Sequence, residues 1–586
     1  MSHLLKHVFI PVLVGSTLFL ASLVYYGYAA VNFPTLFNLD NHLNHAATRY
    51  IVEHQQIPVV RAEDTEIVFT ELGTTRSLRP PFTFILSAFV AMAADGWVDS
   101  RITRQRLGAS VIGAAVVVIA FAGFYISFNS IGLALFGAVA IGLLPKFVFL
   151  ASSNNDDIGA ILSVSLLFFS TLALIKYKGE TWVLVFLAMS FGLVLQTKFT
   201  AWLTLPWLGI FSLILLKPLW SKLVRLLPLL LVVTLLSGGW WVFFNLIHYG
   251  IDDPLAFRYA AELQRNFSVI DPNLQGYAST GVGIFELLTN HDQFLVKSSK
   301  SFIGYLEWLE LEMGAGTYMF FGSLFFIGLV GPVFRTRSQL QENYYFEIVI
   351  LLMILGQTLF YLHHNLIRDI QPQARYILPI IMPLVYLVLR TLSLVPPTTV
   401  TLKIKHLKFN FQQIASIVLL IACVSLHLVA LTIYIKPSFE AQNYYTRITP
   451  PKSFNLQNSF KIASASGISH EVTKGKLVLK RTNNEVPTLV LDSSFCELLP
   501  LNALITLEIN AQSKGALTLR LDHNNQGSYD NIVWRSFPAG KSTVTFSINT
   551  NNCTGAKITL AKQTNHITLD NLQISELKIH QHGKPI

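Results

Sequence analysis

Long apolar runs recur along the first 436 residues of this chain, and they constrain its fold more than any other feature. Three of them are VFIPVLVGSTLFLASLVYYGYAA, VIGAAVVVIAFAGFYISF and IVLLIACVSLHLVALTIYI. Each is long enough, as a helix, to cross the roughly 30 Å hydrocarbon core of a bilayer. Of the 586 residues, 52% are hydrophobic and 13% are charged, which is too apolar for one soluble core. The sequence therefore predicts a polytopic membrane protein that is mainly α-helical.

The basic residues predict how these segments are oriented. Lys and Arg gather in short loops, among them KYKGE, KPLWSKLVR, RTR and VPPTTVTLKIKHLKF, which are expected in the cytoplasm. The loops between them, and everything after about Ile435, are then expected outside. The net charge of +10 follows from these loops. It therefore indicates membrane topology and attraction to anionic membrane lipids, and it does not indicate nucleic acid.

The number of crossings follows from parity. Twelve apolar segments are present, but a cytoplasmic N-terminus and an external C-terminus require an odd number of crossings. The segment PFTFILSAFVAMAADGWV is the weakest candidate, because it opens on two prolines and is shorter than a usual span, so we expect it to lie in or dip into the outer interface. The helical bundle is therefore expected to have about eleven to thirteen spans, with eleven favoured by parity.

The composition changes near Pro437. Short alternating segments such as KLVLKR, ALITLEINA, TVTFSIN and HITLDNLQIS replace the long apolar runs. A period of two in segments of this length is typical of antiparallel strands. We expect a membrane domain at 1–436, with external loops at 31–80 and 250–317, and an extracytoplasmic all-β sandwich of jelly-roll type at 437–586. Cys496 and Cys553 in this second domain either form a disulfide or remain two thiols.

A polar stretch, FNLDNHLNHAATRYIVEHQQIPVV, follows the first apolar segment. The order of Asp40, Tyr50-Ile51 and Pro58, followed by Arg79-Pro80-Pro81, resembles the first external loop of the C-type glycosyltransferase (GT-C) superfamily. Its polytopic members, which include protein mannosyltransferases and lipid A aminoarabinose transferases, take sugars from polyprenyl-phosphate carriers. Asn41 stands where many members have a second acid.

Three further segments resemble the same superfamily, in the same chain order. LLPKFVFLASSNNDDIGAIL is similar to its second acidic loop, and LQTKFTAWLTLPWL to the Lys-aromatic-Thr entry to a later helix. QPQARYILPIIMPL resembles a Gln-Gly-Arg-Tyr segment, with Ala374 in place of the Gly. The resemblance covers the membrane domain and implies a glycosyltransferase at the outer face of a bacterial cytoplasmic membrane.

The chemistry of sugar transfer from a polyprenyl phosphate gives these residue types a reason. A carboxylate near the outer surface can act as the base for the attacking hydroxyl, and we expect Asp40 in this catalytic role. Cations stabilise the charge that develops on the leaving phosphate. Three roles are open to the acids of the second loop: orienting the acceptor, holding an arginine, or binding a divalent cation with Asp40. The expected substrate-binding residues are Arg79, Asp156, Asp157, Lys198, Arg375 and Tyr376.

Each candidate also has a purely structural interpretation. Asp156–Asp157 follow two asparagines at a predicted helix start, where Asn and acids cap free N–H groups. Lys198 and Arg375 lie near predicted helix ends, from which they can reach lipid headgroups. His42 and His45 are three residues apart, and we expect them on an interfacial amphipathic helix and not in a metal site.

The sequence thus predicts an inverting membrane glycosyltransferase. Its expected partners are a polyprenyl-phosphate-linked sugar, a lipid or glycan acceptor, and membrane lipids; a divalent cation is the one cofactor left open. A lipid or glycan transporter or flippase is the second class, although such proteins tend to show internal repeats, which we do not find here. A third class is a non-catalytic membrane protein that keeps the GT-C fold as a scaffold.

Overall fold

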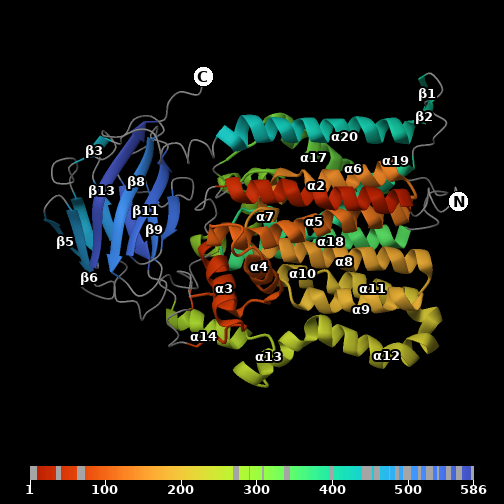
Figure 1. Cartoon of the computed structure of the whole chain (residues 1–586), viewed down its shortest axis with the longest axis horizontal. Coiled ribbons are helices and arrows are strands. Elements are labelled where there is room, and N and C mark those ends of the chain that lie inside the picture. Colours follow the sequence, from red (N-terminus) through yellow and green to blue (C-terminus); the bar gives the residue numbers. More distant parts are fainter. Residues whose placement is uncertain are drawn as a thin grey trace.

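A computed structural model describes a bundle of helices and a pair of β-sheets (Figure 1). The described residues are 9–33, 41–61, 67, 73–267, 276–289, 291–306, 309, 311–334, 344–394, 401–404 and 407–437, followed by the strands between Lys452 and Gln581. The expected base Asp40 and the cysteines Cys496 and Cys553 lie outside the described residues.

Seven helices of the described residues are long and apolar enough to cross a membrane. An eighth is reached when α6 (Ile131–Gly142) and α7 (Pro145–Ala151), which meet at a bend of 68°, are counted as one broken span. The chain is therefore a multi-pass membrane protein. The seven are Ile10–Asn32 (α2), Arg101–Phe128 (α5), Asp156–Tyr177 (α8), Phe199–Tyr249 (α10 to α13), Ala315–Phe334 (α17 with its last turn), Tyr344–Ile367 (α18) and Phe411–Ile435 (α20 with its last turn).

This number is lower than the eleven spans expected, because several apolar segments form short or broken helices. Thr181–Leu195 (α9) has 15 residues, and Ile381–Ser393 (α19) has 13. As one straight helix, Phe199–Tyr249 would be roughly 76 Å long, more than twice the thickness of the hydrocarbon core. A 3-10 segment at Lys217–Leu219 interrupts it, and α12 (Trp220–Thr234) then packs against α9 (Figure 1).

Two short helices lie at one end of the bundle. Asn41–His54 (α3) runs across the direction of the long helices, and it packs against Phe82–Ala93 (α4) (Figure 1). Their contact is apolar and includes Ala47, Ile51, Phe84 and Ala88. With 12 residues, α4 is roughly 18 Å long, which is too short to cross a bilayer.

Arginines at the start of α5 hold these elements in place. Arg101 pairs with Glu53 of α3 at 2.8 Å. The buried Arg106 donates hydrogen bonds to the carbonyl oxygens of Ala30 and Phe33 at the end of α2. In the predicted orientation both arginines lie on the outer side of the membrane, where basic residues are uncommon. Their contacts with α3 and with the end of α2 give a structural reason for their presence there.

The segment between α13 (Trp240–Tyr249) and α17 (Ala315–Val330) contains short helices. They are Phe257–Phe267 (α14), Ile284–Leu288 (α15) and Phe294–Ile303 (α16). Leu306 and Leu311 then form an antiparallel bridge. The chain turns back between these two leucines before α17 begins.

The strands after Lys452 form two antiparallel sheets. One sheet has the order β10-β9-β12-β7-β4, and the other has the order β11-β8-β13-β6-β5, with β3 paired to β13. The predicted change from helices to strands is therefore observed. The strands are Lys452–Phe454 (β3), Ile462–Ser466 (β4), Ile468–Thr473 (β5), Lys476–Arg481 (β6), Thr488–Leu491 (β7), Ala503–Gln512 (β8), Leu517–Asp522 (β9), Ile532–Phe537 (β10), Gly540–Ile548 (β11), Ala556–Ala561 (β12) and Asn571–Gln581 (β13). A separate hairpin of Thr401–Ile404 (β1) and Leu407–Asn410 (β2) precedes α20 (Phe411–Val429).

Candidate functional site

Six of the seven residues selected from the sequence meet in one place, which we call the charged cluster. They come from four segments that are far apart in the chain: the turn before α4, the first turn of α8, the residue before α10 (Phe199–Trp202), and a 3-10 turn at Ala374–Tyr376. The seventh, Asp40, lies outside the described residues. The charged cluster consists of Arg79, Asp156, Asp157, Lys198, Arg375 and Tyr376.

Asp156 bridges two cations. Its Oδ2 accepts a hydrogen bond from Nη1 of Arg79 at 2.5 Å, and its Oδ1 accepts one from Nζ of Lys198 at 3.2 Å. The side chain of Asp156 is 5% exposed, whereas that of Arg79 is 26% exposed. Arg79 therefore forms the accessible edge of the charged cluster, and Asp156 holds it there.

Asp157 is fully buried and faces two cations as well. Its Oδ1 accepts a hydrogen bond from Nζ of Lys198 at 2.6 Å, and its Oδ2 lies 3.8 Å from Nε of Arg375. The second contact is an ion pair but is too long for a hydrogen bond. Each of the four carboxylate oxygens thus faces a basic group, as buried carboxylates require. Of the three roles open to these acids, the geometry favours holding the basic side chains.

Lys198 joins the two carboxylates. Burial alone would lower the pKa of Lys198, but Asp156 and Asp157 outweigh burial and hold that pKa above its ordinary value. The ammonium is therefore charged at physiological pH. It lies 4.9 Å from the centre of the Tyr376 ring, and the guanidinium carbon of Arg375 lies 5.5 Å from the same centre. The Tyr376 hydroxyl donates a hydrogen bond to Oε1 of Gln371.

Local sequence explains why the acids are free to form ion pairs. Asn155 is the N-cap of α8, and its Oδ1 accepts a hydrogen bond from the backbone N–H of Asp157 at 2.8 Å. The asparagine thus caps the helix, and the carboxylates point to the cations. The backbone N–H of Phe82 donates to the carbonyl of Gln196 at 3.2 Å, which ties the segment of Arg79 to that of Lys198.

Of the histidine pair His42 and His45, the structure describes the side chain of His45. His45 shares a hydrogen bond with Oε1 of Gln105 through Nδ1, and the amide of Asn154 lies 3.4 Å from the same nitrogen. The side chain of His42 lies outside the description. No group of three His, Cys, Asp or Glu side chains within the described ranges is arranged to hold a metal ion.

The helix that follows Asp40 is anchored beside the acidic loop. Asn154 donates a hydrogen bond from Nδ2 to Oγ1 of Thr48 at 2.9 Å, and both side chains are fully buried. Because α3 begins at Asn41, this bond fixes α3 close to the residues that lead into Asp156. A position of Asp40 near the charged cluster remains a prediction.

Sequence reasoning missed Lys146, in α7. Its side chain is buried, its Nζ donates a hydrogen bond to the carbonyl of Tyr305 at 3.2 Å, and its charge interacts with those of Asp157 and Arg375. The available signal was a lone cation inside the apolar run LLPKFVFLA, since ionisable residues in apolar segments often mark functional sites. The centre of the His364 ring lies 5.6 Å from that of the Tyr376 ring.

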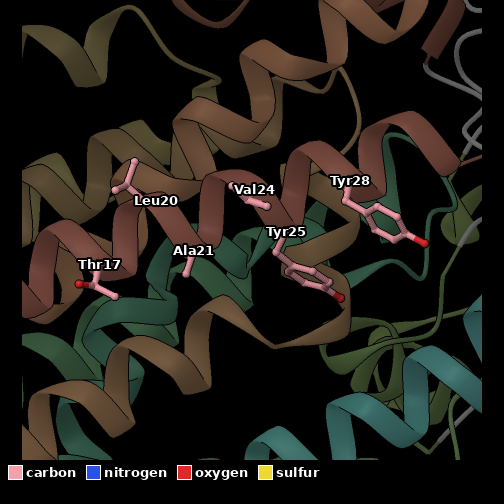
Figure 2. A pocket seen from close by; sticks show the side chains of 6 residues that line it. All are labelled: Thr17, Leu20, Ala21, Val24, Tyr25 and Tyr28. Atoms are coloured by element: carbon pink, nitrogen blue, oxygen red, sulfur yellow. The ribbon is translucent and has the colours of Figure 1, made fainter.

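A groove of about 590 Å³ lies along α2, outside the charged cluster. Figure 2 shows its lining, which is mostly apolar and comes from successive turns of the helix. Near it, the hydroxyl of Tyr25 forms a hydrogen bond of 2.5 Å with Nε2 of His427 in α20. The lining residues are Thr17, Leu20, Ala21, Val24, Tyr25 and Tyr28.

Comparisons with known proteins give one family match. The family model described as "Predicted membrane protein (DUF2142)" matches residues 26–385, a range that includes the whole charged cluster. No curated protein matches the sequence.

Among solved structures, the crystal structure of ArnT from Cupriavidus metallidurans bound to undecaprenyl phosphate is 16% identical to this chain, with a TM-score of 0.43. The apo structure of the same protein is 17% identical, with a TM-score of 0.42. Each match covers 65% of this chain, which thus spans 60% of the length of ArnT. A family 29 carbohydrate-binding module from Piromyces equi matches over 23% of this chain and 91% of its own length, at 10% identity and a TM-score of 0.18.

Proposed function

The chain belongs to the membrane-protein family DUF2142, and we propose that it is a glycosyltransferase that moves a sugar from a polyprenyl-phosphate donor to an extracytoplasmic acceptor. The acceptor is a glycolipid, a cell-surface polysaccharide or a protein. The observation that carries this proposal is the charged cluster, in which Arg79, Lys198 and Arg375 meet Asp156–Asp157 at one end of a multi-pass bundle.

A buried group of cations suits a phosphate leaving group. Within the described part of the chain, three basic side chains of the charged cluster face two carboxylates, so positive groups outnumber negative ones. The carboxylates hold the cations in position before a ligand arrives. Donors that are positioned in advance stabilise developing charge more strongly in a dry site than in water. Arg adds a planar fork that matches phosphate oxygens, and Lys adds a point charge.

A structural role alone explains this arrangement less well. Burying an ion pair costs several kcal/mol of desolvation for each ion, about as much as the pair recovers, so such clusters add little net stability. Ionisable groups inside membrane domains are costly and generally serve substrate or ion binding. Arg79, with about a quarter of its side chain exposed, leaves one edge of the charged cluster open to a ligand.

The proposed reaction breaks one bond and forms one. The acceptor hydroxyl oxygen bonds to the anomeric carbon of the sugar as the bond from that carbon to the phosphate oxygen breaks. The electron pair of the broken bond leaves with the polyprenyl phosphate, and the hydroxyl proton goes to a carboxylate. Attack opposite the leaving group inverts the anomeric configuration. Because Asp156 and Asp157 hold cations, Asp40 is the base that we propose.

The proposed topology has eleven crossings. Four segments add to the seven long spans: the bent pair α6 and α7, the short helices α9 and α19, and the returning half of Phe199–Tyr249. With the N-terminus in the cytoplasm, the ends of these helices that carry Asp156, Lys198 and Arg375 all face outward. The charged cluster then lies at the outer face of the bacterial cytoplasmic membrane.

We also propose that 1–436 is the catalytic membrane domain and that 437–586 is an extracytoplasmic jelly roll. The strand order supports this, because β6 pairs with β13 in one sheet and β7 pairs with β12 in the other, as expected when a long hairpin wraps into two sheets. The proposed role of this domain is to bind the acceptor glycan or to cover the site.

Mass spectrometry of envelope glycans and lipid-linked sugars tests the proposed function. Cells that lack the gene are compared with cells that carry it again on a plasmid. We expect the deletion to remove one sugar from a surface glycan and to raise the amount of its polyprenyl-phosphate donor, with both changes reversed by the plasmid. An unchanged glycan profile together with the accumulation of an untransferred lipid would support the flippase class instead.

A further inference from the structure

Lys146 is a buried cation that the proposed mechanism does not use. Its side chain is 1% exposed, and it lies in the short helix α7 that leads to the acidic loop. An ammonium group carries three hydrogen-bond donors, and one of them is used by the carbonyl of Tyr305 at 3.2 Å. The ammonium also lies 5.4 Å from the centre of the Phe149 ring.

The charge of Lys146 lacks an acidic partner of its own. Among the residues that the structure describes, no carboxylate lies within ion-pair distance of its Nζ. Its charge is repelled by that of Arg375 and, less strongly, attracted to that of Asp157. A carbonyl and an aromatic ring offset only part of the cost of burying an ammonium. An anion that contacts both Lys146 and Arg375 would replace this repulsion by two attractions.

The loop above Lys146 is fixed in place. Added to Gly304, a Cβ would lie 2.8 Å from Cγ of Met313 and 3.0 Å from Cβ of Pro145, so the loop rests directly on the start of α7. In the last turn of α16, Oγ of Ser301 accepts a hydrogen bond of 2.7 Å from the backbone N–H of Ala374. The end of α16 and the glycine that follows it therefore contact both the residue that precedes Lys146 and the residue that precedes Arg375.

We propose that Lys146 is a further phosphate-binding residue, which contacts the phosphate of the polyprenyl-phosphate donor together with Arg375. This inference rests on the proposed function and extends the phosphate site beyond the charged cluster. The alternative role, a tie that only holds the loop at Tyr305, needs the hydrogen bond but not the charge.

Glutamine separates the two roles, because Lys146→Gln keeps a donor for the Tyr305 carbonyl and removes the charge. Lys146→Arg keeps the charge. Lys222→Gln is the matched control, since Nζ of Lys222 also donates to a backbone carbonyl, that of Gly179 at 3.0 Å, but lies in α12. The full-length protein is purified into nanodiscs of zwitterionic lipid, and each variant is first checked for its thermal unfolding midpoint.

The measurement is the affinity of each variant for undecaprenyl phosphate and for undecaprenol, which has the same tail without the phosphate. We expect the wild type to prefer the phosphate lipid. Lys146→Gln should weaken binding of that lipid about 10-fold, equivalent to about 1.4 kcal/mol, and leave undecaprenol binding unchanged. Lys146→Arg and Lys222→Gln should keep most of the preference for the phosphate.

Two results would overturn the inference, and they are distinguishable. If the wild type prefers the phosphate lipid and Lys146→Gln binds it equally well, Lys146 is only a structural tie and the proposed function stands. If the wild type binds both lipids equally, the donor class is wrong, and the proposed function is contradicted along with the role of Lys146.

Discussion

Replacing Lys198 with methionine removes the one cation that both buried aspartates share. The substitution keeps the length of the side chain and deletes the ammonium, which lies 3.2 Å from Asp156 and 2.6 Å from Asp157. Asp156 keeps its bond to Arg79 at 2.5 Å, whereas Asp157 keeps only the longer contact with Arg375 at 3.8 Å among the described ion pairs. The substitution therefore leaves the charge of Asp157 less well compensated than that of Asp156.

The cost follows from the burial of Asp157. Removing one partner of a buried ion pair typically destabilises a protein by about 3–5 kcal/mol, because a buried charge is left uncompensated. We expect the lower value, about 3 kcal/mol, since Arg375 remains near Asp157. An unfolding entropy of about 2.1 cal/mol/K per residue gives about 0.9 kcal/mol/K for residues 1–436. The unfolding midpoint should therefore fall by about 3 °C.

The assay is thermal unfolding of purified wild type and variant in the same detergent at pH 8. Lys176→Met is the control, since Lys176 is exposed at the other end of the same helix as the aspartates. A midpoint for Lys198→Met within 1 °C of the control would refute this view of the charged cluster.

Three further predictions concern the same site. Arg375→Lys should lower sugar transfer at least about 10-fold without loss of membrane insertion, because lysine lacks the planar fork of arginine. The measurement is sugar transfer in membrane extracts, and unchanged transfer would show that Arg375 does not bind the phosphate. Asn155→Ala should destabilise the protein by about 1 kcal/mol, because the N-cap of α8 is lost. The variant should therefore unfold at a lower temperature than wild type, and an equal unfolding midpoint would show that the cap is dispensable. The contribution of the Lys198 charge to stability should be fully present below the ordinary lysine pKa of about 10.4, and it should be lost only as the pH rises through the higher pKa of the folded state. An unfolding midpoint that falls between pH 7 and pH 9 in wild type but not in Lys198→Met would contradict this prediction.

Much of the charged cluster could be predicted from the sequence. Successive membrane helices alternate in direction, so every second loop lies on the same side of the membrane. The positive loops are expected on the cytoplasmic side, which places the loops of Asp156, Lys198 and Arg375 together on the outer side. The pairing of individual atoms could not be predicted, because sequence spacing does not show that one lysine reaches both carboxylates. The capping role also could not be assigned, since Asn155 and the two acids all have the chemistry of an N-cap.

Other features depend on three-dimensional packing. Lys146 lies in an apolar run, and hydropathy does not show that its ammonium reaches the carbonyl of Tyr305, 159 residues further along the chain. The shortness of α19 also cannot be read from hydropathy, because its apolar run already begins at Ile377, before the helix starts. Hydropathy alone therefore does not separate the seven long helices of the described residues from the shorter apolar helices, although the division into apolar helices and later strands was predicted correctly.

The most direct test of glycosyl transfer at the charged cluster is complementation of the gene deletion, read out by glycan mass spectrometry. Wild type, Asp40→Asn, Arg79→Gln and the control Lys176→Met are expressed at matched levels in the membrane. Arg79 is chosen because it forms the exposed edge of the charged cluster and its replacement should not prevent folding. We expect wild type and the control to restore the missing sugar, and the other two variants to leave it absent. Full restoration by both Asp40→Asn and Arg79→Gln would contradict catalysis at this site.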